Sequence, residues 1–298
     1  MTGPSTWQLR TRSLELGSRT LIMAVVNITP DSFSDGGRFL ATEAAVARSI
    51  QCLEEGADIL DLGAESTRPG SHAGGPDALV SADEEQARLL PVLESLLKAR
   101  PNAVVSIDTY RSETARAALS AGAEIVNDAS GLAWNPELAG VCAESGAGLV
   151  LSHTRGRPDE WLSQAPLNAD ALLALVRDGL SHSLSAALQA GVAADSIVLD
   201  PGYGFGKRLD ENYALLTRQS ELLSLGRPLL AGLSRKSFLG HTLAPLHAGQ
   251  PAPVTERENA SLAALTAAIL NGASIVRVHS VRASVEAARI ADAIRAAR

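Results

Sequence analysis

Short apolar segments alternate with longer helical segments along this chain, and this alternation limits the folds that it can adopt. The short segments have the length and apolar composition of strands that are buried on both faces. Strands that alternate with helices form a parallel sheet with right-handed crossovers. The predicted strands are Leu21–Asn27, Ile59–Gly63, Val104–Asp108, Ile125–Asp128, Leu149–His153, Ile197–Asp200, Pro228–Leu233 and Ile275–His279.

The number of strand–helix units favours a closed barrel over an open sheet. A (β/α)8 TIM barrel takes about 250 residues, and this chain has 298 residues with no shift in composition that would mark a second domain. We therefore predict an α/β fold with one barrel domain over residues 21–298. Residues 1–20 form an extension whose alternating pattern predicts a small hairpin that closes the bottom of the barrel. The clearest helical segments are Thr42–Glu55, Ala82–Ala99, Ser112–Ala121, Asp170–Ala190 and Arg257–Asn271.

Composition excludes several classes of protein. The net charge is −7 and the sequence has no lysine or arginine block, which argues against general binding to nucleic acid. No apolar run approaches the roughly 18 residues of a membrane span. Cys52 and Cys142 lie far apart, without a CxxC motif, which fits a reducing cytosol better than a disulfide framework. The sequence therefore predicts a cytoplasmic protein without a membrane or nucleic-acid partner.

Almost every predicted strand ends in a polar side chain. The carboxyl ends of the strands of a β/α barrel share one face, and that face carries the active site. Two of the loops that follow these strands, Asn27–Gly37 and Glu65–Gly70, are also rich in polar residues and glycine. The polar residues at the strand ends are Asn27, Asp61 with Thr67 and Arg68, Asp108, Asn127 with Asp128, His153, Asp200, Ser234–Lys236, and Arg277 with His279.

These polar residues divide into two chemical sets. The first, which we call the heterocycle set, mixes hydrogen-bond donors and acceptors as the edge of a planar heterocycle requires. The second, which we call the anion set, has amide and cationic groups suited to a phosphate or diphosphate. The heterocycle set is Asp108, Asn127, Asp200 and Lys236, and the anion set is Asn27, Arg68, Arg277 and His279.

Each residue also has a purely structural interpretation. Asp128 precedes Ala-Ser-Gly and suits a helix N-cap, and Asp61 suits a residue that only orients an arginine of the following loop. His153 suits a core histidine, and Arg277 suits a partner for a surface acid. The glycines of Asp200–Lys207 are weak evidence for a phosphate loop, and the aromatic residues among them suit packing. The functional interpretation therefore depends on the co-occurrence of these residues.

Several motifs resemble those of a known family, the dihydropteroate synthases of the folate pathway, which sulfonamides inhibit. The segment Met23–Gly37 resembles the first signature of that family, and Asp61–Gly70 resembles the second. Five further motifs follow in the family's order, and together the resemblance runs from about residue 21 to the end. They are Ser106–Tyr110, Asn127-Asp128, Asp200–Lys207, Gly232–Ser237 and Arg277–His279.

The resemblance implies a barrel enzyme that condenses 6-hydroxymethyl-7,8-dihydropterin diphosphate with 4-aminobenzoate, giving 7,8-dihydropteroate and diphosphate. It implies that the heterocycle set holds the pterin, that the anion set holds the diphosphate, and that Asn27 also lies near Mg²⁺. It further implies a homodimer with small-molecule substrates. The implied aminobenzoate pocket is Thr67, Arg68, Pro69, Phe205, Lys236 and Ser237, and the implied catalytic residues are Asp108, Arg68, Lys236, Arg277 and His279.

Three features depart from the family's pattern. Ser280 stands where the family often has an aspartate. Ser152-His153-Thr154 replaces a usual Met-His-Met, which would loosen apolar packing on the pterin. The loop after Gly70 is several residues longer than in close relatives. None of these departures removes a residue of either set.

The two sets also suggest a mechanism. Once its charge is neutralised, diphosphate leaves readily, and we favour a dissociative route through a pterin cation that Asp108 stabilises over direct displacement. Two other functions remain open. One is a catalytically silent pterin-binding paralogue. The other is a methyltransferase that moves a methyl group from methyltetrahydrofolate to a corrinoid protein.

Overall fold

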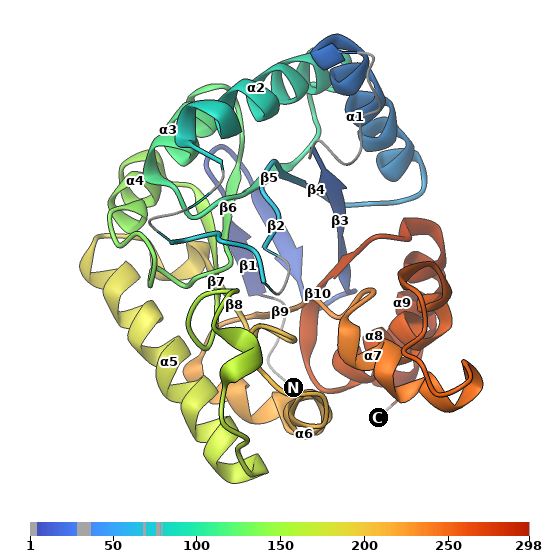
Figure 1. The fold of residues 1–298 in the computed structure, drawn as a ribbon. Coiled ribbons are helices and arrows are strands. Elements are labelled where there is room, and N and C mark those ends of the chain that lie inside the picture. The colour runs from blue at the N-terminus through green and yellow to red at the C-terminus, as the bar shows by residue number, and fades with distance from the viewer. Residues whose placement is uncertain (1–4, 29–36, 68–69, 76–77, 79, 298) are drawn as a thin grey trace.

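Eight parallel strands close into a barrel in the order β10-β3-β4-β5-β6-β7-β8-β9. The computed structural model describes residues 5–28, 37–67, 70–75, 78 and 80–297. Helices surround the strands as an outer ring (Figure 1), so the predicted (β/α)8 barrel is confirmed. The barrel strands are β3 Leu21–Asn27, β4 Ile59–Gly63, β5 Val105–Asp108, β6 Ile125–Asp128, β7 Gly148–Ser152, β8 Ile197–Asp200, β9 Leu229–Ala231 and β10 Ala273–Val278.

The helices follow the strands in the expected alternation. Among the predicted segments, Ala82–Ala99 is confirmed in full as α2, whereas α1 begins at Gly37, earlier than predicted. No helix in the described part of the chain combines the length and the apolar character that crossing a membrane requires. The helices are α1 Gly37–Glu54, α2 Ala82–Ala99, α3 Ser112–Ser120, α4 Leu138–Ser145, α5 Ala169–Gln189, α6 Glu211–Thr217, α7 Ser237–Thr242, α8 Glu258–Leu270 and α9 Val281–Ala296.

Strand β9 is shorter than predicted, because it was predicted over Pro228–Leu233 and spans only Leu229–Ala231. Beyond Ala231 the chain leaves the sheet, and Arg235 takes a left-handed backbone conformation with φ of 61°. An apolar run continues through Leu233, which is buried outside the strand. Apolar composition therefore predicted burial correctly here but overestimated the length of the ladder.

The inward-facing side chains change from apolar to polar along the barrel axis. Ile59, Ile125, Val198 and Ile275 belong to one buried cluster at the amino-terminal end of the strands. Side chains two residues apart on a strand share a face. The next inward positions are therefore Asp61, Asn127, Asp200 and Arg277. The barrel thus has an apolar bottom and a polar mouth at the carboxyl ends of its strands.

A two-stranded hairpin closes the bottom, as predicted from residues 1–20. Strand β1 (Ser5–Gln8) pairs antiparallel with β2 (Ser13–Leu16). Trp7 is fully buried in the same apolar cluster as Ile59, and its indole Nε1 donates to Ser196 O at 2.8 Å. The turn is held by the backbone N–H of Thr11, which donates to Glu124 at 2.9 Å. The hairpin therefore completes the barrel core.

The hairpin should contribute measurably to stability through Trp7. The Trp7→Ala substitution removes a fully buried indole and should cost about 3–5 kcal/mol of unfolding free energy. Chemical denaturation measures this loss, and Thr6→Ala on the exposed face of β1 is the matched control. A Trp7→Ala variant as stable as the Thr6→Ala control would show that the hairpin is only an accessory.

Candidate active site

A buried ion-pair network lies at the polar mouth of the barrel. The Arg277 guanidinium of β10 donates from Nε to Asp61 Oδ2 and from Nη2 to Asp108 Oδ2, each at 2.6 Å. Asn127 Nδ2 donates to the same Asp61 Oδ2 at 3.0 Å. We call Asp61, Asp108, Asn127 and Arg277 the mouth network. It joins four strands, β4, β5, β6 and β10, into one polar unit.

Burial shapes the charge state of this network. The pKa of Asp108 is raised to about 7, chiefly by burial, with Asp61 adding to the rise and Arg277 opposing it. Burial alone would lower the pKa of Arg277, but the two carboxylates outweigh it and raise that pKa. Gly63 makes room for this arrangement, because a Cβ there would lie 3.4 Å from the Cβ of Asp108. Asp108 can therefore exchange a proton near neutral pH.

Asp200 and Lys236 form the other half of the heterocycle set. Asp200 Oδ1 accepts from the backbone N–H of Gly202 at 2.7 Å. Burial lowers the pKa of Lys236 to about 8, while the Asp200 carboxylate opposes that change. The Lys236 ammonium lies 3.9 Å from the centre of the Phe205 ring, a cation–π contact. All four residues of the heterocycle set therefore lie at the mouth.

The aromatic side of the mouth is built by the loop after β8. Gly204 has φ of +79°, and a Cβ there would lie 3.1 Å from Lys236 Cδ, so glycine lets the lysine cross this loop. Phe205 stacks on Trp161 with ring centres 4.9 Å apart. The ring that contacts Lys236 is thereby held from behind.

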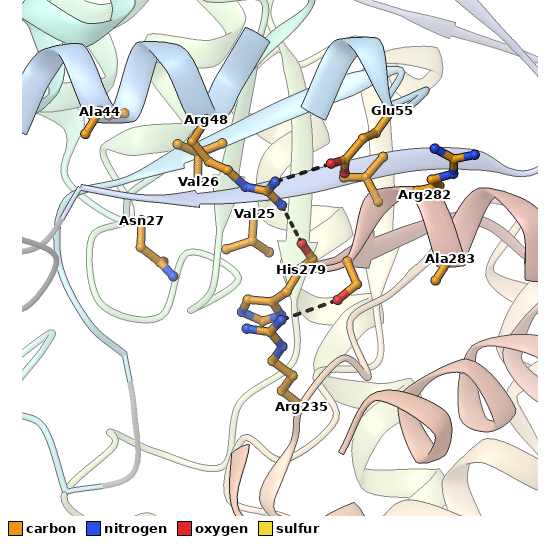
Figure 2. Close-up of a pocket in the computed structure, with 13 residues that line it drawn as sticks. Val25, Val26, Asn27, Ala44, Arg48, Glu55, Arg235, His279, Arg282 and Ala283 are labelled. Carbon is orange, nitrogen blue, oxygen red and sulfur yellow. Dashed lines mark hydrogen bonds and ion pairs between the residues drawn. The ribbon is translucent and has the colours of Figure 1, made fainter. Parts of the chain in front are cut away.

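Two residues of the anion set, Asn27 and His279, border a cavity of ≈ 700 Å³ between α1, β3 and the start of α9. Arg48, Arg235 and Arg282 add positive charge to its lining, and Glu55, which lies 3.7 Å from Arg48, offsets part of that charge. Arg48 donates from Nη2 to the backbone oxygen of His279 at 2.9 Å (Figure 2). Ser234 Oγ contacts His279 Nδ1 at 3.0 Å. The cavity thus offers cationic and amide groups to an anion beside the mouth.

The structure gives less information on the predicted site residues in the loop after β4 and at the start of α7. Arg68 and Pro69 lie outside the described residues. Thr67 is half-buried, and Ser237 is the exposed first residue of α7. The place of Arg68 in the anion set therefore stays a prediction. Within the described part of the chain, Arg277 pairs with Asp61 and Asp108 at the same distance of 2.6 Å.

Two of the structural alternatives agree with the structure only in part. Asp128 accepts from the backbone N–H groups of Ser130 and Leu132, but it holds a turn and not a helix N-terminus, because α4 begins only at Leu138. His153 is buried, and burial lowers its pKa well below the ordinary value, but its Nδ1 has no hydrogen-bond partner among the described residues. A third is wrong in its details, because Arg277 does pair with acids, but these acids lie inside the mouth and not on the surface.

The departures from the family's pattern have local structural partners. Thr154 Oγ1 accepts from Trp161 Nε1 at 3.0 Å and donates to Gly156 O at 2.8 Å, so it supports the tryptophan behind Phe205. Ser280 donates to Glu258 at 2.6 Å and accepts from Arg235 at 3.3 Å. Thr154 and Ser280 therefore both have hydrogen-bond partners in this structure.

The sequence interpretation missed the central place of Asp61. The sequence signal was available, because Asp61 shares its face with Ile59 and is an acid within an otherwise apolar strand. Arg48 was missed for another reason. It lies on α1, and no strand-end position or loop motif in the sequence points to it.

Comparison with known proteins agrees with this geometry. A family model described as pterin binding enzyme matches residues 23–279. The chain belongs to the pterin-binding enzyme family. A dihydropteroate synthase of Mycobacterium leprae is 43% identical over 272 residues, which cover 91% of this chain and 92% of the relative.

Two solved structures are also similar over nearly the whole chain. The Yersinia pestis dihydropteroate synthase in complex with a sulfonamide drug has a TM-score of 0.86 and 36% identity, covering 98% of this chain and 99% of that one. The Xanthomonas albilineans enzyme with 4-aminobenzoic acid has a TM-score of 0.84 and 38% identity, with the same coverage of 98% and 99%.

The raised pKa of Asp108 predicts a pH-dependent effect of Asp108→Asn on stability. The carboxyl has its ordinary pKa of 3.8 when unfolded and about 7 when folded. Between these values folding must bind a proton or bury a charge, so the wild type loses stability as pH rises through this window. The asparagine variant does not titrate, so its melting temperature relative to wild type should rise from about pH 4 to pH 7. Thermal unfolding of both proteins across this range would contradict the assignment if the difference stayed constant or fell.

Proposed function

We infer that this chain is a dihydropteroate synthase, a transferase of folate biosynthesis that condenses 6-hydroxymethyl-7,8-dihydropterin diphosphate with 4-aminobenzoate. The observation that carries this conclusion is the joint presence of the heterocycle set at the barrel mouth and the family match over residues 23–279. The products are 7,8-dihydropteroate and diphosphate. The similarity to enzymes crystallised with 4-aminobenzoic acid and with a sulfonamide drug supports the same aryl-amine substrate and the same class of inhibitor here.

The pterin would bind inside the mouth. Asp200 Oδ1 already accepts a hydrogen bond from the backbone of its own loop. Oδ2 points toward the interior and lies 3.8 Å from the position that a Cβ on Gly232 would take. A buried carboxylate accepts hydrogen bonds from the amino and ring N–H groups of a pterin. Asp108, Asn127 and Lys236 would complete the edge. This division agrees with the mixed donors and acceptors of the heterocycle set.

The diphosphate would bind toward the cavity beside the mouth. Asn27 and His279 line that cavity, and Arg277, which precedes His279 by two residues at the end of β10, bonds to Asp61 and Asp108 at the pterin side. Arg68, which lies outside the described residues, would close the site from the second loop. Thr67, Arg68, Pro69, Phe205, Lys236 and Ser237 would hold the aminobenzoate.

Mg²⁺ would bind at this site mainly through the phosphate oxygens of the substrate. In the described part of the chain no three acidic, histidine or cysteine side chains gather to hold a metal ion. Mg²⁺ keeps several waters and commonly takes substrate phosphates with one or two protein oxygens. The amide oxygen of Asn27 suits that role. The bound ion would supply charge neutralisation to the leaving diphosphate.

The side chains support a dissociative route. Asp61, Asp108 and Arg277 together carry one net negative charge when both carboxylates are ionised, which suits a cation that develops at the pterin methylene. Asp200 would hold the ring in place while Arg277 and His279 stabilise the departing diphosphate. The aryl amine then attacks without a strong base, because it is already a nucleophile.

We also propose a cytoplasmic homodimer. Helix α9 exposes Ile290 and Ile294, which lie four residues apart on one helical face and are 64% and 44% exposed. An exposed apolar stripe of this kind is typical of a subunit interface. The two cysteines, Cys52 and Cys142, are free and buried, which fits a reducing compartment.

A turnover assay tests the function directly. The purified protein with the dihydropterin diphosphate, 4-aminobenzoate and Mg²⁺ should form 7,8-dihydropteroate, which chromatography detects, and release diphosphate. Omission of aminobenzoate is the control. Pteroate binding without turnover would favour a silent pterin-binding paralogue. Methyl transfer from methyltetrahydrofolate to a corrinoid protein would favour the other alternative.

A further inference from the structure

Asp61 is a fully buried carboxylate whose described side-chain partners are both candidate substrate-binding residues. Its Oδ2 accepts from Asn127 Nδ2 at 3.0 Å and from Arg277 Nε at 2.6 Å. Its Oδ1 has no hydrogen-bond partner among the described residues. Asp128, which is equally buried, bonds only within its own turn. A carboxylate that only stabilises a local turn would be expected to bond as Asp128 does.

The carboxylate of Asp61 determines the orientation of the Asn127 side-chain amide. An ionised carboxylate can only accept hydrogen bonds, so Asn127 must direct its NH₂ group toward Asp61. The amide oxygen then points to the opposite side, and no described residue donates to it. Asn127 therefore presents an acceptor to whatever occupies the mouth, and Asp61 is the reason.

The same oxygen of Asp61 also fixes Arg277. Nε of the guanidinium is held by Asp61, which leaves Nη2 directed at Asp108. The guanidinium is planar, so two fixed bonds define the orientation of the whole group. Asp61 lies one inward-facing position deeper than Gly63, which pairs with Asp108. It thus contacts both residues from β4.

We propose that Asp61 is a positioning residue that sets the hydrogen-bond polarity of Asn127 and the orientation of Arg277 for a pterin ligand. The inference rests on the proposed function, since it needs the heterocycle set to bind a pterin. Asp61 itself needs no contact with the ligand. Its effect on binding should therefore pass through Asn127 and Arg277.

The first test is Asp61→Asn, measured by calorimetry with pteroate. An amide at position 61 can donate, so Asn127 can reverse and offer its NH₂ group to the ligand. We expect pteroate affinity to fall about tenfold or more. In an Asn127→Ala background the same substitution should have a clearly smaller effect, because one of the two residues through which it acts is gone. An unchanged affinity, or an effect as large in both backgrounds, would overturn the proposal.

Asp128→Asn is the matched control. It makes the same chemical change at an equally buried carboxylate of β6, and it should lower the melting temperature while leaving pteroate affinity within about twofold. If it weakens pteroate binding as much as Asp61→Asn does, the effect is one of general stability and the proposal fails.

The second test uses the Asn127→Asp variant and does not depend on whether the Asp61→Asn variant folds. Asn127→Asp places two carboxyl groups about one hydrogen bond apart, which raises one pKa of the pair. When protonated, Asp at 127 donates to Asp61 and keeps its carbonyl oxygen toward the ligand, as the amide does. Pteroate affinity relative to wild type should therefore be near normal at low pH and should fall as pH rises.

Other groups near residue 127 titrate or carry charge as well, so the comparison with wild type at each pH is essential. They are Asp61, Asp108 and Arg277 in the network, with Asp200 and Lys236 across the mouth. A constant ratio of the two affinities across pH would overturn the proposal. Failure of the wild type to bind pteroate at all would instead overturn the proposed function.

Discussion

The placement of the Arg277 guanidinium between the fully buried carboxylate of Asp61 and the largely buried carboxylate of Asp108 is the constraint on which the mouth of this barrel depends. Charges removed from water are costly unless they are paired with good geometry. Arg277 meets that condition with two bonds of 2.6 Å, to Asp61 and to Asp108. Removal of Arg277 would leave the two carboxylates without their shared cation. The strands that carry them are therefore fixed relative to one another at the end where substrate would bind.

This constraint links two binding functions that would otherwise be separate. Arg277 belongs by chemistry to the anion set, yet its bonds go to Asp61 and Asp108 at the pterin side. His279 follows it two residues later, just beyond the end of β10, and lines the cavity beside the mouth. The carboxyl end of β10 and the residue after it therefore join the proposed pterin and diphosphate sites. Departure of the diphosphate would therefore change the surroundings of Arg277, the group that faces the pterin.

Much of this arrangement could be predicted from the sequence. The apolar runs end at the polar residues that form the mouth, so the boundaries of β3, β4, β6 and β8 were predicted correctly. A parallel barrel places all carboxyl ends on one face, which brought the heterocycle set together. The pairing of Arg277 with Asp61 was not predicted, because these residues are 216 positions apart and their contact depends on the stagger of the barrel.

The roles of the residues that depart from the family's pattern could not be predicted from the sequence for a similar reason. Thr154 was expected to loosen the pocket, but its hydroxyl holds Trp161, which supports Phe205. Ser280 was noted as a lost aspartate, but it bridges Glu258 and Arg235. Trp161 lies seven residues after Thr154 in the same connection, whereas Glu258 and Arg235 come from distant parts of the chain, and only the folded chain brings these groups within hydrogen-bond distance.

A crystal structure of the protein with pteroate and diphosphate tests the central claim most directly. The account predicts the pterin edge within hydrogen-bond distance of Asp108, Asn127 and Asp200, with Arg277 still bonded to Asp61 beneath it. It also predicts diphosphate near Asn27 and His279. A pterin bound outside the mouth, or a complex in which Arg277 leaves Asp61, would contradict the account.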